Sequence, residues 1–544
     1  MHAFDRAVSG KCPVALVVLC GLALALRLWR LDVQPLWFDE ALSAHIALAP
    51  DGLAFVHNTP PLYHWLSRGW VALFGGGAAG LRSLSAVAGA ALVWAAFVAA
   101  RALFDRRAAW ATALLAAVAP LPLFYAQEAR AYALLLVLLT AAVAAGWRVA
   151  AVGGRGPWVA WVGSGVLALH THYLAALPLA VAGALLPWVA PAGERRRVLR
   201  ATIVAGVAMA AALLPWWWWW SAHTPFQGSD MRWLALLWQQ LSAPRAVLHS
   251  LELFALGGEA GRTPIVMKQF TTLPFPAWLR LAGLAAAGAV LGLGAVRLVR
   301  TERRSAAAFA VALGLLPLLG LCLLSTVRPV YAPGRYDLIA LPGCLLLFGA
   351  AAAAATAPDR GWRRWIAWAA VAVFGLAVVV KDQRYLMAPP APDAAPAVAA
   401  HLAAHVRDGD TVVLVGGVGL PVVVQLAQRD LPWAAGRCGA PPGRTFACRL
   451  LPLALEQAPA AMSRYLQAIE DRSLVHDLGT VAADVAASGA TGVWLVLPDD
   501  LRDGGPAAAT VGRALFQALF ERGFQPVEGG DPALGIARCA RPGR

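Results

Sequence analysis

Two adjacent carboxylates, Asp39 and Glu40, follow the first long apolar stretch and stand beside large aromatics, in the sequence Trp-Phe-Asp-Glu at residues 37–40. Acidic side chains beside a bilayer are costly unless they are paired or functional. A buried carboxylate with a raised pKa can accept a proton from a hydroxyl or amine as that group attacks. The pair is therefore the first candidate for chemistry, because a helix cap at Asp39 alone would leave Glu40 unexplained.

Three further polar clusters interrupt the apolar sequence. They are Tyr-Ala-Gln-Glu-Ala-Arg-Ala-Tyr at 125–132, His-Thr-His-Tyr at 170–173, and Arg-Pro-Val-Tyr-Ala-Pro-Gly-Arg-Tyr-Asp at 328–337. Arginine and tyrosine side chains can bind and neutralise a phosphate, with bidentate contacts from arginine. Together with a carboxylate, they suit transfer of a group from a lipid phosphate. The sugar–phosphate bond supplies the driving force of such a reaction, so no ATP site is needed.

Simpler interpretations of these clusters stay open. Glu128 and Arg130 could pair with each other or with a neighbouring helix, and Arg335 and Asp337 could mark a membrane boundary. The histidines at 170 and 172 are more typical of helix capping or of the membrane interface than of ligands.

The elements that must position these residues are membrane helices. The chain has 544 residues, of which 60% are hydrophobic and 14% charged, a composition outside that of ordinary soluble domains. Apolar runs long enough to cross about 30 Å of hydrocarbon recur over the first 380 positions. We expect about eleven spans, near 13–31, 82–102, 108–124, 131–147, 158–173, 174–190, 201–217, 279–298, 305–325, 337–356 and 363–381.

Arginine clusters in every second loop orient these spans, because short cytoplasmic loops collect Lys and Arg. The clusters lie near 101–107, 148–155, 195–200, 297–304 and 360–364. The four polar clusters then share the opposite, exported face, with the N-terminus cytoplasmic. The first apolar run lacks a signal-peptidase motif and is expected to be retained as a helix. The net charge of +15 is explained by the same arginines, and no nucleic-acid-binding motif accompanies them.

The chain divides at a Pro/Ala linker around 388–392. We expect a transmembrane domain over 1–384, with exported loops at 32–81 and 218–278, and a small exported α/β domain over 385–544. In the latter, 411–415 and 492–497 are typical of buried strands and 512–521 of an amphipathic helix. The glycines at 416–419 are interpreted as a turn rather than a nucleotide loop.

Tryptophans and cysteines add to this picture. Five consecutive tryptophans at 216–220 suit an interfacial anchor or, alternatively, an aromatic wall beside a lipid or sugar. Cys438 and Cys448 are near enough in sequence for a disulfide in an oxidising compartment. The cysteines lack the spacing of a zinc site.

The order of these motifs resembles a known family. Trp-Phe-Asp-Glu after the first helix is followed by Pro-Pro-Leu-Tyr at 60–63, Tyr-Ala-Gln-Glu-Ala-Arg-x-Tyr, and Arg-Tyr with a downstream Pro342. This order resembles the GT-C glycosyltransferases, and within them the bacterial family 39/83-type enzymes related to protein O-mannosyltransferases and the lipid A aminoarabinose transferase. The resemblance covers about residues 13–345.

The resemblance implies an enzyme that moves a sugar from a polyprenyl phosphate to an acceptor on the exported side, with inversion. The catalytic carboxylate would be Asp39, and Glu40 would help to position acceptor or donor. The remaining implied site residues would bind the donor phosphate or substrate and are Tyr63, Arg130, Tyr132, Arg335 and Tyr336, while Glu128 would orient Arg130. The lipid A-modifying relatives carry Glu-Lys before their Pro-Pro, whereas Asn58 and Thr59 stand here. No cofactor is certain, although a divalent metal ion is possible.

The sequence thus predicts an α-helical polytopic GT-C enzyme of a bacterial inner membrane. It would use a polyprenyl-phosphate sugar to glycosylate a lipid, glycan or protein of the cell envelope, with no nucleic-acid partner. A transporter or flippase is an alternative, but internal repeats and interrupted helices at mid-membrane are not visible. A non-catalytic assembly protein acting through its tail is another. An oligosaccharide ligase or polymerase with a pyrophosphate-linked donor is a third.

Overall fold

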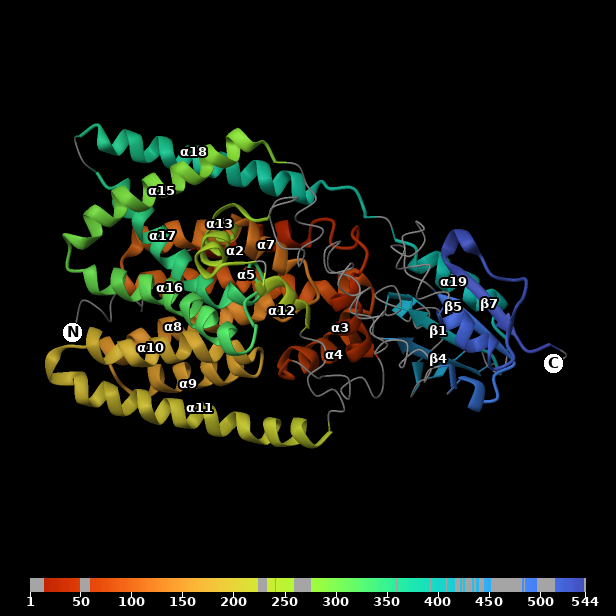
Figure 1. Ribbon diagram of the computed structural model, residues 1–544. Helices are drawn as coiled ribbons and strands as arrows, with labels where there is room; N and C mark the ends of the chain where they lie inside the picture. The colour runs from red at the N-terminus through yellow and green to blue at the C-terminus, as the bar shows by residue number, and fades with distance from the viewer. Residues whose placement is uncertain are drawn as a thin grey trace.

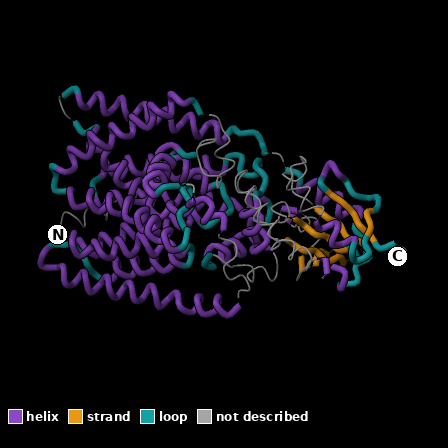
Figure 2. Tube along the Cα trace, viewed as in Figure 1, coloured by secondary structure: helices purple, strands orange, loops and turns teal. Residues whose placement is uncertain are grey.

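A helical bundle and a smaller β-sheet unit make up the protein, seen side by side in the computed structural model (Figure 1; Figure 2). The structure describes residues 14–48, 59–223, 232–239, 241–258, 275–358 and 361–391. In the C-terminal part it describes 393–407, 409–415, 421–422, 424–425, 433–434, 437–439, 445–451, 482–483, 485–496 and 514–542.

The bundle is built from long apolar helices and several shorter ones. The long helices are α5 (Ala78–Leu103), α8 (Tyr132–Ala151), α11 (Arg195–His223), α15 (Ala277–Val299), α16 (Arg304–Val327), α17 (Leu341–Ala355, preceded by the 3-10 helix η5, Tyr336–Ala340) and α18 (Arg363–Leu386). The shorter helices are α2 (Val14–Leu28), α3 (Phe38–Leu48), α4 (Leu62–Phe74), α6 (Arg106–Val118), α7 (Pro120–Ala126), α9 (Arg155–Leu169), η2 (Tyr173–Ala175), α10 (Ala176–Val189), η3 (Ala192–Glu194), α12 (Arg232–Gln239) and α13 (Ala243–Leu256).

The protein is an α-helical polytopic membrane protein. Within the described residues, seven helices are long and apolar enough to cross a bilayer, or eight if the bent pair α6–α7 is one span. Each of the eleven predicted spans falls on a helix, but α2, α9 and α10 have 15, 15 and 14 residues, fewer than the roughly 20 that a full crossing needs. The predicted number of eleven is therefore not confirmed, whereas the helical, polytopic class is.

Two predicted arginine loops meet at one end of the bundle. Asp105 accepts a hydrogen bond from the Ala108 amide at the start of α6 and pairs with Arg303 from the α15–α16 junction. A carboxylate at a helix N-terminus is favoured by the helix dipole. This contact joins two loops to which the arginine count assigns the same side.

A break between α6 and α7 precedes the polar cluster at 125–132. The two helices meet at 54°, because Pro120 and Pro122 at the start of α7 lack the N–H groups needed to continue α6. The fully buried Arg27 of α2 donates to the freed carbonyls of Ala116 and Ala117 at 2.9 and 3.0 Å. Helix α7 ends at Ala126, and the segment 127–131 that follows contacts α3 through the Ala129 amide and Glu40.

Both segments predicted as long exported loops contain helices. The first, 32–81, holds α3 and α4, and the second, 218–278, holds the end of α11 together with α12 and α13. Two carboxylates in the first turn of α3 favour a helix start there through the helix dipole. The first loop is thus partly rigid, and it carries Asp39 on a helix.

The C-terminal part contains helix α19 (Ala395–His405) and a seven-stranded mixed sheet in the order β2-β3-β4-β1-β5-β7-β6. The strands are β1 (Thr411–Val415), β2 (Trp433–Ala434), β3 (Arg437–Gly439), β4 (Thr445–Leu451), β5 (Gly492–Val496), β6 (Gln525–Pro526) and β7 (Ile536–Ala540). The central β1 runs parallel to β4 and β5, and the remaining pairs are antiparallel. All described strands of the chain lie in this part.

The sequence located the two inner strands of this sheet correctly. Both 411–415 and 492–496 are strands, and every residue of β5 is buried. Residues 514–520, inside the predicted amphipathic helix, are helical. The predicted turn at 416–419 and the side chains of Cys438 and Cys448 lie outside what the structure describes.

Helices α3 and α4 lie between the bundle and the sheet (Figure 1). Val424 of the C-terminal part belongs to the same buried cluster as Ala41 and Ala44 of α3 and Ala129 of the 127–131 segment. The helix that begins with Asp39 and Glu40 is therefore packed on two sides, by the bundle and by the sheet unit.

Candidate active site

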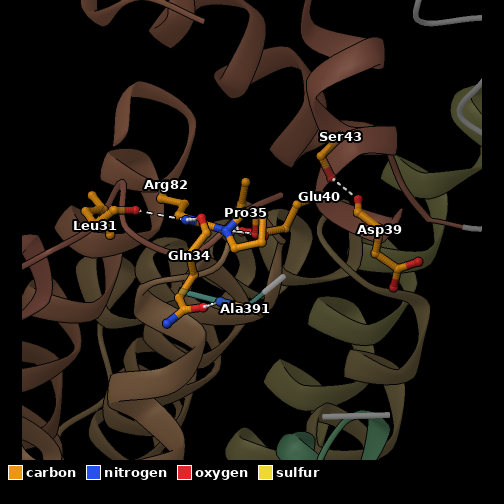
Figure 3. A network of polar contacts seen from close by, with 9 residues as sticks. Leu31, Gln34, Pro35, Asp39, Glu40, Ser43, Arg82 and Ala391 are labelled. Atoms are coloured by element: carbon orange, nitrogen blue, oxygen red, sulfur yellow. Dashed lines mark hydrogen bonds and ion pairs between the residues drawn. The ribbon is translucent and has the colours of Figure 1, made fainter. Parts of the chain in front are cut away.

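The two adjacent carboxylates point in different directions. Successive residues on a helix are about 100° apart, and Figure 3 shows the Asp39 and Glu40 side chains diverging from the first turn of α3. Each carboxylate meets its own arginine partners. The pair that stands together in sequence therefore belongs to two different polar groups.

The first group is the ion pair of Glu40 with Arg82 of α5. The guanidinium binds both carboxylate oxygens, with Nε to Oε1 at 2.7 Å and Nη2 to Oε2 at 2.6 Å. Glu40 Oε1 also accepts the Ala129 amide at 2.8 Å. The side chains of Arg82 and Glu40 are 3% and 1% exposed, so this is a fully buried, bidentate pair.

The remaining donors of Arg82 bind the chain that leads into α3. They reach the carbonyls of Leu31, Gln34 and Pro35 at 2.9, 2.7 and 2.9 Å (Figure 3). Arg82 therefore holds the segment 31–35 and the first turn of α3 in one arrangement. Both carboxylate oxygens of Glu40, predicted as a catalytic or substrate-positioning residue, are bound by Arg82 in this geometry.

The second group surrounds Asp39 and includes two arginines from distant parts of the chain. Its Oδ2 atom contacts Arg335 Nη2, and Arg130 Nη2 lies 3.8 Å away. Arg130 also donates to the Asp39 carbonyl at 3.2 Å and to Ser43 Oγ at 3.3 Å. The Asp39 side chain is 14% exposed, so it is partly open where Glu40 is closed.

Aromatic rings enclose the Arg335 guanidinium. Its Nε donates to the Tyr132 hydroxyl at 2.6 Å, and its carbon lies 5.8, 5.9 and 5.6 Å from the ring centres of Trp37, Tyr132 and Tyr336. Rings at this distance stabilise a guanidinium through their quadrupoles. The structure therefore brings together four of the predicted residues, Asp39, Tyr132, Arg335 and Tyr336, from α3, α8 and the α16–η5 junction.

The turn before Arg335 is fixed by groups outside the predicted site. Gly334 has a φ of +79°, a conformation that favours glycine. Its amide donates to Asp337 Oδ2 at 2.9 Å, and its carbonyl accepts the Tyr125 hydroxyl. Asp337, first interpreted as a candidate boundary marker, thus shapes the Arg335 turn.

Glu128 lies beside the site without pairing with Arg130. The contact between the two residues joins the Arg130 amide to the Glu128 carbonyl at 2.8 Å, while the Glu128 Oε2 atom is buried with no hydrogen-bond partner. Burial, and next the Glu40 carboxylate, raises the pKa of Glu128 well above its ordinary range. Glu128 is therefore favoured in its neutral form, and its role in orienting Arg130 stays a prediction.

Tyr63 contacts the Arg130 segment through Ser85. It is 1% exposed, and its hydroxyl lies 3.1 Å from Ser85 Oγ, which donates to the Arg130 carbonyl at 3.2 Å. Burial raises the pKa of the Tyr63 phenol to about 12. In this arrangement Tyr63 acts on the site through Ser85, whereas the sequence predicted a direct phosphate or sugar contact.

The two histidines act as helix caps, as the simpler interpretation held. His170 Nδ1 lies 2.9 Å from the Val166 carbonyl, and His172 Nδ1 accepts the Leu174 amide at 3.2 Å. The His172 ring also stands 5.4 Å from the Tyr336 ring. Burial, then the charges of Arg335 and Arg130, lowers the pKa of His172 to about 3, so this wall of the site is neutral.

The tryptophan run has two different faces. Trp216 is buried, donates to the Tyr173 hydroxyl at 2.9 Å, and packs with Ile46 of α3. Trp217 and Trp218 are 50% and 71% exposed. Trp216 therefore packs against α3 while its two neighbours are exposed, and both the interfacial anchor and the aromatic wall beside a lipid or sugar stay predictions.

The described side chains near the site do not form a donor set for a divalent metal ion. Among the described residues, no group of three or more His, Cys, Asp or Glu side chains is placed to hold one. Asp39 and Glu40 both face guanidinium groups, whose charge disfavours a cation beside them. Residues 57 and 58 lie outside the described chain.

Some site residues were not predicted from the sequence. Arg82 and Ser43 are the main ones, and Trp37 was noted only as an aromatic neighbour of the carboxylates. An arginine at the edge of the apolar run 82–102 was a usable signal, since a charge within a span marks a partner or a function. Ser43 offered no such signal, because its contact with Arg130 depends on the approach of α3 to the 127–131 segment.

One known family model matches part of the chain. Residues 58–220 match the family model described as dolichyl-phosphate-mannose-protein mannosyltransferase, a segment that includes Arg82 and Arg130 but neither Asp39 nor Arg335. No curated protein matches the chain in sequence.

Two solved structures share the architecture over nearly the whole chain. ArnT from Cupriavidus metallidurans bound to undecaprenyl phosphate superposes with a TM-score of 0.56 at 16% identity, covering 97% of this chain and 98% of that chain. The apo form of the same protein gives 0.53 at 15%, covering 96% and 97%. At such identity the likeness establishes the fold alone. The protein therefore has the GT-C fold, and the predicted resemblance to GT-C glycosyltransferases is confirmed.

Proposed function

We propose that this protein is an integral-membrane glycosyltransferase that moves a sugar from a polyprenyl-phosphate donor to a lipid, glycan or protein acceptor on the exported face, with inversion. The observation that carries the proposal is the convergence of Asp39, Arg130 and Arg335 at one end of the bundle. The fold shared with an ArnT bound to undecaprenyl phosphate supports the choice of donor class.

The charge of the Asp39 group suits an anionic donor. Arg130 and Arg335 supply two positive charges against one negative charge from Asp39, which leaves a net charge of +1 if Glu128 is neutral. A phosphate entering here would take over the guanidinium contacts as charge-assisted hydrogen bonds. Arg335 would then exchange its contact with Asp39 for one with the phosphate and free the carboxylate.

The freed carboxylate is placed to act as a general base. As the acceptor oxygen attacks the anomeric carbon, its proton would pass to Asp39, and the bond from that carbon to the phosphate oxygen would break. The bonding electrons would remain on the departing polyprenyl phosphate, where Arg130 and Arg335 stabilise the charge. Attack from the face opposite the phosphate inverts the anomeric centre.

Sidedness and compartment follow from the charge pattern rather than from the fold. The arginine-rich loops would face the cytoplasm and the Asp39 end the exported side, which would place the C-terminal unit outside the inner membrane of a bacterium. Cysteine labelling with a membrane-impermeant reagent at an exposed position of the C-terminal unit tests this orientation.

The donor can be tested directly on purified protein. Lipid extracted from the protein and analysed by mass spectrometry should contain a polyprenyl monophosphate with or without a sugar, and radiolabelled sugar should pass from it to an envelope fraction. A pyrophosphate-linked glycan would favour the ligase or polymerase alternative. If membranes that contain the folded protein and a suitable acceptor form no product from any polyprenyl-monophosphate sugar, the proposal is wrong.

A further inference from the structure

The linker to the C-terminal unit contacts the chain just before α3. Arg30 donates to the carbonyls of Leu386 and Ala388 at 3.2 and 3.1 Å. The Gln34 amide donates to the Pro389 carbonyl at 2.9 Å and accepts the Ala391 amide at 3.0 Å. These contacts join residues about 355 positions apart in sequence. All four are made to backbone atoms, three before Pro390 and one after it.

Gln34 connects this linker to the catalytic helix. Its side chain binds the linker, whereas its backbone carbonyl accepts from Arg82 at 2.7 Å. Arg82 holds Glu40, and Glu40 is covalently next to Asp39 (Figure 3). A continuous series of polar contacts thus runs from the linker to the residue beside the proposed base.

The linker is suited to transmit displacement. Consecutive prolines at 389 and 390 fix φ and stiffen the chain. Beyond it, Val424 packs in the buried cluster with Ala41 and Ala44. The C-terminal part therefore meets α3 through Val424, and the linker meets the segment that leads into α3 through Arg30 and Gln34.

We propose that Arg30 and Gln34 are positioning residues that couple the C-terminal unit to Asp39, so that the unit helps to set the catalytic geometry of the membrane site. This inference rests on the proposed function for its kinetic consequence. Its structural consequence, a change in the order of α3, does not depend on any activity. Coupling of this kind requires one element that both sites bias, and here that element is α3.

Two full-length variants break the coupling without a change in the site residues. Gln34→Leu removes both side-chain contacts with the linker while keeping a similar volume. Arg30→Gly removes the guanidinium and fits the φ of +51° at this position, where glycine is unstrained. Gln517→Leu is the matched control, because Gln517 contacts Glu521 on the exposed surface of the C-terminal unit.

The first measurement is hydrogen exchange of residues 38–48 in the full-length protein. Gln34→Leu and Arg30→Gly should raise exchange in α3 at unchanged melting temperature, while Gln517→Leu should match the wild type. Unchanged exchange in both variants would overturn the inference, whatever the activity of the protein.

The second measurement is the kinetics of sugar transfer. A small misplacement of the base lowers turnover more than binding, so kcat should fall about 10-fold with KM for the lipid donor nearly unchanged. Equal losses in kcat and melting temperature would mark a merely structural role and contradict positioning. If the wild type itself transfers no sugar, the proposed function fails, and the exchange result still decides the coupling.

Discussion

Two arginine–carboxylate groups begin at neighbouring residues and differ in almost every physical respect. The Glu40–Arg82 pair is one-to-one, bidentate and closed, with side chains 1% and 3% exposed. The Asp39 group sets one carboxylate against two arginines and is 14% exposed at the carboxylate. The first is neutral and fully satisfied, whereas the second carries an excess positive charge that an anion can neutralise. Adjacent acidic residues thus divide into a closed ion pair and a partly open, positively charged group.

The largest effect should come from Asp39→Asn. Loss of a general base costs about 10²–10⁴-fold in rate, so kcat should fall roughly 1000-fold. The amide leaves Arg130 and Arg335 without their counter-charge, so donor affinity should be retained or increased. Transfer kinetics on the purified protein measure the fall in kcat, and lipid-donor binding measures the affinity.

Asp105→Asn is the matched control for this change. It makes the same substitution at the start of α6, in the ion pair with Arg303, where asparagine still caps a helix. Transfer by this variant should equal that of the wild type. An Asp39→Asn enzyme of undiminished kcat would remove Asp39 from the chemistry.

Glu40→Gln should act on folding instead of chemistry. Removing one partner of a buried pair costs about 3–5 kcal/mol, so the free energy of unfolding should fall by roughly 3 kcal/mol, although Gln keeps some hydrogen bonds to Arg82. Thermal unfolding in detergent measures this loss. A large fall in kcat at unchanged stability would instead give Glu40 the catalytic role that its position in sequence first indicated.

Arg335→Lys should weaken binding of the donor more than it lowers the stability of the fold. Lysine keeps the charge but loses the planar contact with Tyr132 and the surrounding rings. A hydrogen bond to a charged group is worth about 1.5–3 kcal/mol, so kcat/KM should fall about 30-fold. Arg303→Lys, at the other end of the bundle, should leave kcat/KM unchanged.

The smallest effect should be the pH dependence that comes from Glu128. Its raised pKa means that the native protein holds a proton that the unfolded chain releases above about pH 4.3. Stability therefore falls as pH rises through this window towards the folded pKa. Ionised Glu128 would also cancel the net positive charge beside Asp39, so KM for the donor should rise with pH.

Glu128→Gln tests whether Glu128 causes both pH dependences, that of stability and that of the donor KM, because glutamine cannot ionise. The variant should lose both the fall in stability with rising pH and the rise in KM, while its kcat at neutral pH stays within about threefold of wild type. Melting temperature and donor KM measured from pH 5 to 9 test this. An identical pH profile in wild type and variant would contradict the neutral form of Glu128.

Local patterns were sufficient for much of the fold. Hydropathy placed every predicted span on a helix, and the strands at 411–415 and 492–496 followed from short apolar runs between turn residues. The helices inside 32–81 and 218–278 were not predicted. Their apolar faces are short, and tertiary packing, as of Ile46 against Trp216, stabilises them more than hydropathy reveals.

The sequence by itself determined which residues could do chemistry. Charges in an apolar chain are few, so Asp39, Arg130 and Arg335 could be selected by type and assigned to one membrane face by the arginine loops. Only the tertiary structure decided which carboxylate meets which arginine. Successive side chains of an α-helix point about 100° apart. That rotation directs Glu40 to Arg82 and leaves Asp39 facing the partly open, positively charged group.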